Sequence, residues 1–296
     1  MTHDPRPTTS MRTVLLTTLA LIAFAANSLL CRLALRGQAI DPATFSAIRI
    51  ASGALILGFL VRWPSGAPPK PGASSWTSAG LLFLYAAPFS FAYLHLSAGT
   101  GALLLFASVQ VTMVLAALVR GERPRPIQWV GLTVAIAGLV YLVLPGLAAP
   151  DPFSAALMLL AGIAWGLYSL RGRSTTAPLA QTAGNFARAM PMALVLCLVA
   201  WPVPSLKASG VLWAVLSGAI ASGIGYALWY AALRHLTAMT AAIVQLAVPI
   251  LAGAGGVLLL REVLTIRLAV AAVLVLGGIS MAILGRPRAD ACQRPN

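Results

Sequence analysis

The stretch HLSAGTGA at residues 95–102 returns as HLTAMTAA at residues 235–242, an offset of 140 residues. In both copies a glutamate, Glu122 or Glu262, follows the histidine by 27 residues. Repetition at a fixed distance indicates an internal duplication. The same offset pairs Phe89 with Trp229 and Gly138 with Gly278, and an offset of 141 pairs IAF at 22–24 with IAW at 163–165. The duplication is therefore predicted to run through most of the chain.

The composition predicts an integral membrane protein. Of the 296 residues, 59% are hydrophobic and 9% are charged, whereas soluble domains carry about 25% charged residues. A helix needs about 20 apolar residues to cross a bilayer. Ten such segments are predicted, at 12–35, 43–61, 76–95, 99–119, 126–145, 153–171, 179–200, 209–233, 237–260 and 264–285.

The number of segments predicts how the two copies are oriented. Each copy, 12–145 and 153–285, holds five spans, and an odd number of crossings returns the second copy upside down. Inverted repeats of this kind are typical of secondary transporters, whose site lies near the bilayer midplane between the halves. The predicted fold is an all-α membrane protein with ten transmembrane helices, arranged as two inverted five-helix repeats around a central cavity.

Basic residues predict the orientation in the membrane, because lysine and arginine are retained on the cytoplasmic side. With the N-terminus inside, 13 basic residues fall in cytoplasmic segments and 5 fall outside. The tails at 1–11 and 286–296 are therefore expected in the cytoplasm. Topology and anionic headgroups account for the net charge of +14, so membrane lipid is an expected partner and nucleic acid is not.

The N-terminal segment allows a second interpretation, and the number of cysteines limits the kinds of site that the chain can form. A cleaved signal peptide ending near residues 23–25 is a second interpretation of the N-terminus, but the repeat partner of that segment, 153–171, favours a span. Three scattered cysteines, Cys31, Cys197 and Cys292, are too few for a disulfide framework or a metal site. No metal and no cofactor are expected.

Acidic residues are scarce, which limits the mechanism. The carboxylate side chains lie in tails or at predicted span ends; they are Asp4, Asp41, Glu122, Asp151, Glu262 and Asp290. Proton-driven export of cations usually relies on an acidic residue inside the membrane. A neutral, zwitterionic or anionic substrate is therefore expected.

Two arginines fall inside predicted spans. Arg49 lies about seven residues into the second span and Arg188 about nine into the seventh, and these spans are repeat partners. An arginine in the membrane is costly unless it is paired or hydrated. Each side chain either snorkels to the interface or faces the cavity, where its fork geometry would bind a carboxylate.

Aromatic residues concentrate on related helices. Spacings of three and four residues put each set on one helical face; the sets are Tyr85 with Phe89 and Tyr93, Tyr226 with Trp229 and Tyr230, and Trp165 with Tyr168. Tyrosine and tryptophan also form belts at membrane interfaces. That explanation weakens for the residues toward mid-span, which are Tyr85, Phe89, Tyr226 and Trp229. These four, together with the pair Trp165 and Tyr168, are the candidate cavity walls.

Proline interrupts three spans, at Pro88, Pro191 and Pro249. Each proline frees the carbonyl four residues earlier, and for Pro249 that carbonyl belongs to Gln245, a further candidate binding residue. Irregular backbone inside a membrane occurs where it is buried or lines a cavity. The prolines are therefore either gating hinges or simple packing bends.

The duplicated five-helix unit resembles the EamA unit of the drug/metabolite transporter superfamily. The resemblance rests on the link from His235 to Thr240, Pro249, and LLLRE at 258–262. Arg49 resembles the arginine that many members carry in the second span, and GYALW at 225–229 resembles their eighth helix. Val109 departs from the pattern because it stands where Pro249 stands in the second copy. Within the superfamily the chain is most similar to YddG-like amino-acid exporters.

The resemblance implies a multi-pass protein of a bacterial inner membrane that exports small metabolites and is not an enzyme. The predicted function is alternating-access transport of neutral or aromatic amino acids, as an exporter or uniporter. The alternative is a carrier of anionic or phosphorylated metabolites, favoured if Arg49 and Arg188 face inward together. An intramembrane enzyme is a remote second alternative, since the sequence has no HExxH or GxSxG motif. The sequence does not determine the exact substrate or whether transport is coupled to protons. It also does not determine the oligomeric state, and a monomer is one of the alternatives.

Overall fold

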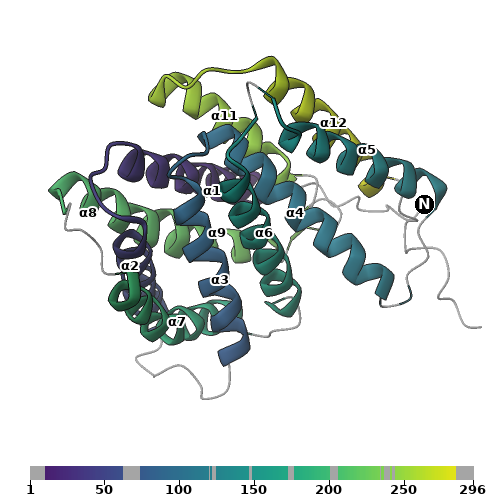
Figure 1. Cartoon of the computed structure of the whole chain (residues 1–296). Coiled ribbons are helices and arrows are strands. Elements are labelled where there is room, and N and C mark those ends of the chain that lie inside the picture. The colour runs from purple at the N-terminus through teal and green to yellow at the C-terminus, as the bar shows by residue number, and fades with distance from the viewer. Residues whose placement is uncertain are drawn as a thin grey trace, which may run out of the picture.

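A computed structural model describes residues 11–62, 74–119, 121, 125–146, 149–172, 177–200, 206–233, 235–236, 241 and 244–284. All the regular structure in these residues is helical (Figure 1). The first half contains α1 (Met11–Arg36), α2 (Pro42–Arg62), α3 (Trp76–Ala92), α4 (Ala98–Val119) and α5 (Pro126–Val143). The second half contains α6 (Pro152–Gly172), α7 (Pro178–Ala200), α8 (Ala208–Val215), the π-helix η1 (Leu216–Ile224), α9 (Gly225–Leu233), α11 (Ala247–Leu260) and α12 (Ile266–Leu284).

Each predicted span contains helix, with two differences in detail. The eighth span is a continuous helix over 208–233 whose centre, η1, is a π-helix. The ninth was predicted from residue 237, whereas α11 begins at Ala247; residues 237–240 lie outside the described part of the chain. Pro249 is the third residue of α11, and in the first helical turn a proline removes no intrahelical hydrogen bond.

Helix starts follow local sequence signals. The carboxylate of Asp41 accepts a hydrogen bond from the Thr44 N–H at 2.9 Å, and that of Asp151 accepts one from the Ser154 N–H at 2.8 Å. In both cases a proline follows the aspartate and opens the helix. Aspartate is a preferred N-cap and proline a preferred first residue, so the sequence itself fixes where α2 and α6 begin.

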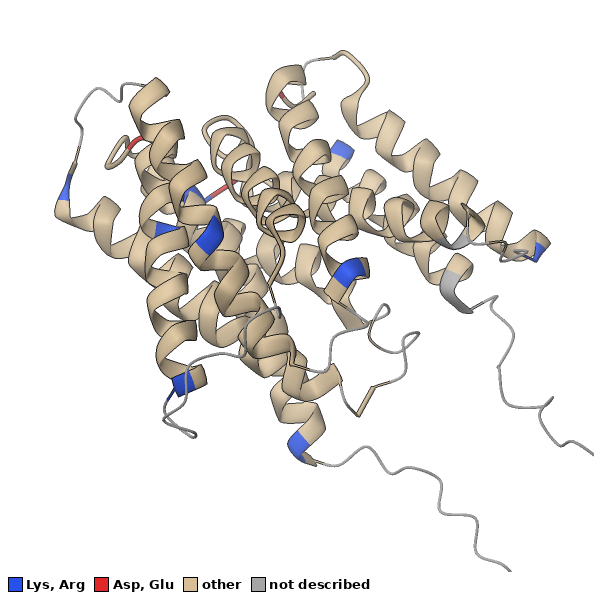
Figure 2. Cartoon of the chain, turned by 90° about the horizontal axis from the view of Figure 1, so that it is seen from below, with Lys and Arg blue, Asp and Glu red and all other residues tan. Residues whose placement is uncertain are grey.

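The outer surface of the molecule is apolar. Large hydrophobic side chains stand exposed on several helices, among them Leu55 at 74%, Leu258 at 78% and Ile266 at 83%. Figure 2 shows that the helices carry Lys and Arg mainly near their ends. Exposed apolar surface on this scale is not compatible with a soluble monomer. The chain is an integral membrane protein.

The apolar helices fall into two groups by length. Seven helical segments are long and apolar enough to cross a membrane; they are Met11–Arg36, Pro42–Arg62, Ala98–Ala116, Pro126–Val143, Pro152–Gly172, Pro178–Ala200 and Ala208–Leu233. Three apolar helices of the described chain are shorter: Trp76–Ala92, Ala247–Leu260 and Ile266–Ala282.

Helices from the two halves interleave. Repeat partners pack on one another in three pairs, α2 with α7, α4 with α11, and α5 with α12. Figure 1 shows α5 and α12 side by side, away from α2 and α7. Several other contacts also occur in exchanged pairs: α3 packs on α6 as α1 packs on α9, and α4 packs on α6 as α1 packs on α11. The centre of the molecule is therefore built from both halves.

Candidate functional site

A narrow cavity lies at this centre, where both halves contribute walls. Its lining is largely aromatic, with a few small polar side chains from α1 and η1. The lining residues are Phe24, Asn27, Ser28, Tyr85, Phe89, Leu105, Phe106, Trp165, Ala221, Ser222 and Tyr226. No acidic side chain occurs in this lining.

Trp165 of α6 connects the aromatic rings around the cavity. Its ring centroid lies 4.8 Å from that of Tyr85 and 5.1 Å from that of Tyr226. On another side it stacks on Tyr168, with 5.5 Å between centroids and 26° between planes. Offset and tilted pairs at these distances are attractive. The cavity is thus bounded by a continuous aromatic cluster that joins α3, α6 and α9.

Arg49 of α2 is buried against this cluster, with 2% of its surface exposed. Its Nη2 donates a hydrogen bond to the Tyr85 hydroxyl at 2.9 Å, and its Nε donates one to Ser222 Oγ at 3.3 Å. The guanidinium carbon lies 5.0 Å from the ring centroid of Tyr85 and 4.9 Å from that of Phe89. Arg49 therefore joins two residues of the cavity wall, one from each half.

The Tyr85 hydroxyl is the centre of a small polar network. It also accepts a hydrogen bond from Asn27 Nδ2 at 3.2 Å. Asn27 Oδ1 in turn accepts one from Ser217 Oγ at 2.6 Å. The network links α1, α2, α3 and η1, so that side chains from four helices fix the orientation of one another.

The π-helix explains how two serines reach this network. Ser217 and Ser222 are five residues apart, which is the hydrogen-bond spacing of a π-helix, and they contact Asn27 and Arg49, respectively. Gly218 lies directly against the Arg49 carbonyl, where a Cβ atom would clash. Single π-turns often occur at functional sites. Here the π-helix brings Ser222 of the second half against Arg49 of the first and Ser217 against Asn27.

The structure brings together some of the residues predicted from sequence. Tyr85, Phe89, Trp165 and Tyr226 line the cavity, and Arg49 adjoins it. Tyr168 and Trp229 form a second layer: Tyr168 stacks on Trp165 and accepts a hydrogen bond from Asn185 Nδ2 at 3.3 Å, while Trp229 packs edge-on against Phe24.

Other predicted residues lie elsewhere. Arg188 is half-buried, and its guanidinium carbon lies 5.9 Å from the ring of Trp76, at the start of α3. Gln245 donates a hydrogen bond from Nε2 to the Ala241 carbonyl at 3.3 Å. Neither residue lines the cavity. Arg49 and Arg188 therefore do not face inward together.

Pro88 and Pro191 lie inside α3 and α7, as expected from the sequence. Pro88 is buried and directly precedes the cavity residue Phe89. Whether these prolines act as hinges or as bends stays a prediction.

Phe24, Asn27 and Ser222 were not among the predicted site residues. The repeat contains a signal for the first two, because the offset of 141 pairs Phe24 with Trp165 and Asn27 with Tyr168. The sequence has no comparable signal for Ser222, since its place depends on the π-helix.

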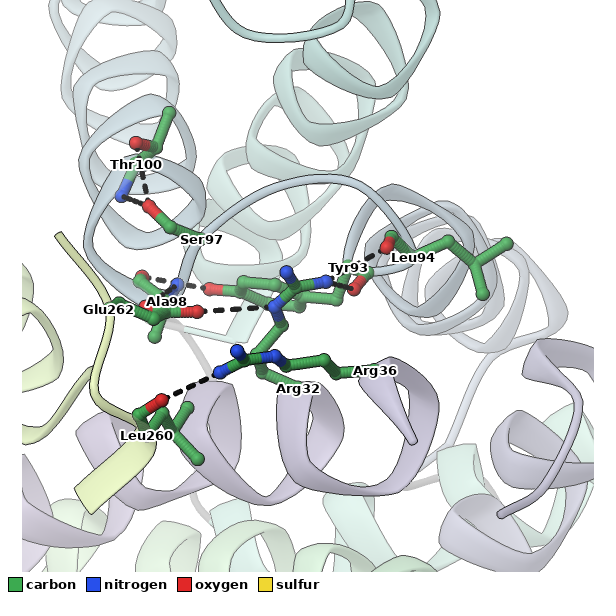
Figure 3. Close-up of polar contacts among 9 residues, drawn as sticks. All are labelled: Arg32, Arg36, Tyr93, Leu94, Ser97, Ala98, Thr100, Leu260 and Glu262. Atoms are coloured by element: carbon green, nitrogen blue, oxygen red, sulfur yellow. Dashed lines mark hydrogen bonds and ion pairs between the residues drawn. The ribbon is translucent and has the colours of Figure 1, made fainter. Parts of the chain in front are cut away.

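At one end of the bundle, four helices meet in a polar cluster (Figure 3). Arg32 Nε lies 3.1 Å from Glu262 Oε1, and Arg32 Nη1 donates hydrogen bonds to the carbonyls of Tyr93 and Leu94 at 2.9 and 2.8 Å. Glu262 Oε2 accepts the N–H of Ala98 at 2.8 Å, at the positive N-terminus of α4. Glu122, the counterpart of Glu262 in the other copy, lies outside the described residues.

The part of the chain that the structure describes holds no group of His, Cys, Asp or Glu side chains arranged to bind a metal ion. The cavity lining offers aromatic surface and a few hydroxyl and amide groups, and the guanidinium of Arg49 adjoins it.

Comparison with known proteins matches both halves of the chain to the same family. The sequence profile of the EamA-like transporter family matches residues 11–144 and again residues 152–284. The chain is similar to Uncharacterized protein PA1977 of Pseudomonas aeruginosa, with 52% identity over 275 residues that cover 93% of this chain and 96% of that protein. It is also similar to the Uncharacterized inner membrane transporter YedA of Escherichia coli, with 27% identity over 146 residues, 48% of each chain.

A solved structure, titled only "Crystal structure of protein", has a similar fold. Its TM-score is 0.63 at 21% identity, and the alignment covers 90% of this chain and 98% of that one.

Proposed function

Since this chain belongs to the EamA-like transporter family and is a membrane transporter, we propose that it moves small metabolites by alternating access. In this mechanism two five-helix repeats, 12–145 and 153–285, rock about a central site. The exchanged pairs of helix contacts support a pseudo-two-fold relation between the halves. We take the three shorter apolar helices as further spans, which gives ten and makes the repeats inverted.

The substrate that we propose is a neutral or aromatic amino acid, exported or carried down its gradient. The observation that carries this proposal is the aromatic cavity between the two halves, which has no acidic side chain in its lining and is adjoined by the buried guanidinium of Arg49. Aromatic walls suit an apolar side chain, and the guanidinium of Arg49 suits a carboxylate. The absence of acid from the lining disfavours a cationic substrate.

A carrier of phosphorylated metabolites has less support. A dianionic phosphate would be expected to need more than one cationic group. Arg188, the second arginine within a span, lies against Trp76 and not at the cavity. This leaves Arg49 as the one cation at the cavity among the described residues.

The protein is proposed to reside in the inner membrane of a bacterium, with both termini in the cytoplasm. The similarity to an inner membrane transporter supports the location. The excess of basic residues in the segments on one side supports the orientation. Nothing in the cavity suggests covalent chemistry, so we propose no enzymatic activity.

Uptake of labelled phenylalanine into liposomes that contain the purified protein tests this function. We expect aromatic amino acids to compete with the label and sugar phosphates to have no effect. A comparison with and without a pH gradient tests proton coupling. Competition by sugar phosphates alone would refute the proposed substrate class.

Two variants test whether uptake depends on the cavity. Trp165→Ala removes the ring that contacts both Tyr85 and Tyr226, and we expect it to abolish uptake. Trp129→Ala is the matched control, because Trp129 of α5 is 48% exposed and lies away from the cavity. Equal uptake by the two well-inserted variants would place the transport path elsewhere.

A further inference from the structure

Two buried polar atoms beside the cavity have no hydrogen-bond partner among the residues that the structure describes. They are Arg49 Nη1 and the hydroxyl oxygen of Tyr226. Arg49 is 2% exposed and Tyr226 is 3% exposed. A buried donor without an acceptor costs free energy, and such groups in a native structure call for an explanation, such as a missing ligand or water. Both atoms can donate a hydrogen bond, so together they call for an acceptor.

The charge of Arg49 is also unbalanced. Among the described residues the carboxylates are Asp41, Asp151 and Glu262, and all three lie at helix ends. The ion pair found in this part of the chain joins Glu262 to Arg32, not to Arg49. Because a buried charge without a counter-ion is strongly unfavourable, an anionic acceptor fits Arg49 better than a neutral one.

We propose that Arg49 and Tyr226 form a carboxylate subsite, and that the carboxylate is the one charged group of the ligand that the cavity recognises. In this structure the cavity has a volume of about 20 Å³, room for about one water molecule, so the ligand enters when the walls move apart. Arg49 Nη1 and the Tyr226 hydroxyl then donate to its oxygens, and its apolar body lies against Trp165 and the rings beside it. This inference rests on the proposed transport function and narrows its substrate class.

An ammonium group has no equivalent partner. The lining contains no acidic side chain. The π-faces of Tyr85 and Phe89, which could otherwise hold a cation, are already occupied by the Arg49 guanidinium. The ring of Trp165 is already in contact with Tyr85, Tyr168 and Tyr226. A second cation there would be repelled by Arg49 in a medium of low dielectric constant. The ligand class is therefore an apolar monocarboxylate, with or without an α-amino group.

Three ligands that share one ring separate the contributions of the two charged groups. Phenylalanine carries both groups, 3-phenylpropionate lacks the amino group, and phenethylamine lacks the carboxylate. We expect phenylpropionate to bind the purified protein at least as tightly as phenylalanine and phenethylamine to show no saturable binding. The readout is the change in tryptophan fluorescence, since Trp165 lies in the cavity wall, and it is independent of transport.

Two variants test the subsite itself. Tyr226→Phe removes a hydroxyl that makes no hydrogen bond to the described part of the chain, so it is expected to keep the fold. It is expected to weaken carboxylate binding by about 10-fold, as for the loss of a hydrogen bond to a charged group. Arg49→Gln is expected to weaken it further. Tyr141→Phe, at an exposed position of α5, is the control and should leave the binding constants unchanged.

The outcomes distinguish this inference from the function on which it rests. If phenylalanine is bound and transported while phenylpropionate is not bound, the subsite model of recognition is overturned and the transport function stands. The same holds if Tyr226→Phe and Arg49→Gln both bind phenylalanine as the parent protein does. If neither phenylalanine nor phenylpropionate binds, the proposed substrate class fails, and the subsite with it.

Discussion

At the scale of single residues, the hydroxyl of Tyr85 has a central position. It accepts hydrogen bonds from Arg49 of α2 and from Asn27 of α1. Both donors are buried, so neither can turn to water if the acceptor is removed. This one oxygen atom therefore links α3 to α1 and α2. Through it α3 also holds Arg49, the cationic side chain found at the cavity among the described residues.

Replacing Tyr85 with phenylalanine is expected to destabilise the protein by about 1–3 kcal/mol, because two buried donors lose their acceptor. The measurement is the midpoint of thermal unfolding in detergent. Tyr141→Phe serves as a control at an exposed position. Equal midpoints for the two variants would show that the network contributes nothing to stability.

At the scale of elements, α5 and α12 meet through glycine. A Cβ atom at Gly278 of α12 would lie 2.5 Å from the Gly131 carbonyl oxygen and 2.6 Å from the Ala135 nitrogen. Gly277, the preceding residue, has nothing within 4 Å of such an atom. Small residues allow helices in a membrane to approach closely, and here only one of two adjacent glycines serves that purpose.

The two glycines therefore give a matched pair of variants. Gly277→Ala and Gly278→Ala gain the same helix propensity, but only the second forces α5 and α12 apart. We expect Gly278→Ala to be less stable than Gly277→Ala by about 1–3 kcal/mol, the range for an overpacked contact. The difference between their thermal midpoints measures the contact. A higher midpoint for Gly278→Ala would contradict the packing.

The ion pair between Arg32 and Glu262 ties α1 to the end of α11. The two side chains are 14% and 9% exposed, so the effect should exceed the about 0–1 kcal/mol of a surface pair. Glu262→Gln removes the charge but keeps an oxygen that can accept the Ala98 N–H. We expect a lower thermal midpoint and, in a double-mutant cycle with Arg32→Gln, a coupling energy above about 1 kcal/mol. Additive effects of the two changes would mean that the pair does not contribute.

At the scale of the whole molecule, the number of spans determines where the termini lie. Ten spans put both termini on one side of the membrane, and seven would put them on opposite sides. Reporters of membrane side fused to each terminus should both indicate the cytoplasm, and a reporter inserted near Pro150, between the two repeats, should indicate the other side. Termini on opposite sides would rule out ten spans.

Much of the fold follows from the sequence because the bilayer restricts the choice. In lipid every backbone polar group must be paired internally, so long apolar segments become helices. The aspartates and prolines at 41–42 and 151–152 then set where helices begin. Part of the aromatic wall could be predicted from position: Tyr85, Phe89 and Tyr226 lie toward the middle of predicted spans, where the interfacial explanation weakens, and all three line the cavity.

The roles of the two arginines could not be separated by sequence. Arg49 and Arg188 occur in partner helices at similar depths, yet Arg49 is buried at the cavity and Arg188 lies beside Trp76. Periodicity assigns residues to a helix, but it does not say which neighbour each face meets. Repeat symmetry points to Phe24 as the partner of Trp165, and the structure places it in the cavity lining.

The sequence by itself determined the duplication, the membrane environment, the approximate helix boundaries and the aromatic character of the centre, because these depend on composition, spacing and local capping. Only the tertiary structure decided that Arg49 meets Tyr85 and Ser222, and that η1 is a π-helix. The contact between Arg49 and Ser222 joins residues 173 positions apart, and that between Arg32 and Glu262 joins residues 230 positions apart. They depend on how whole helices pack, which no local pattern encodes.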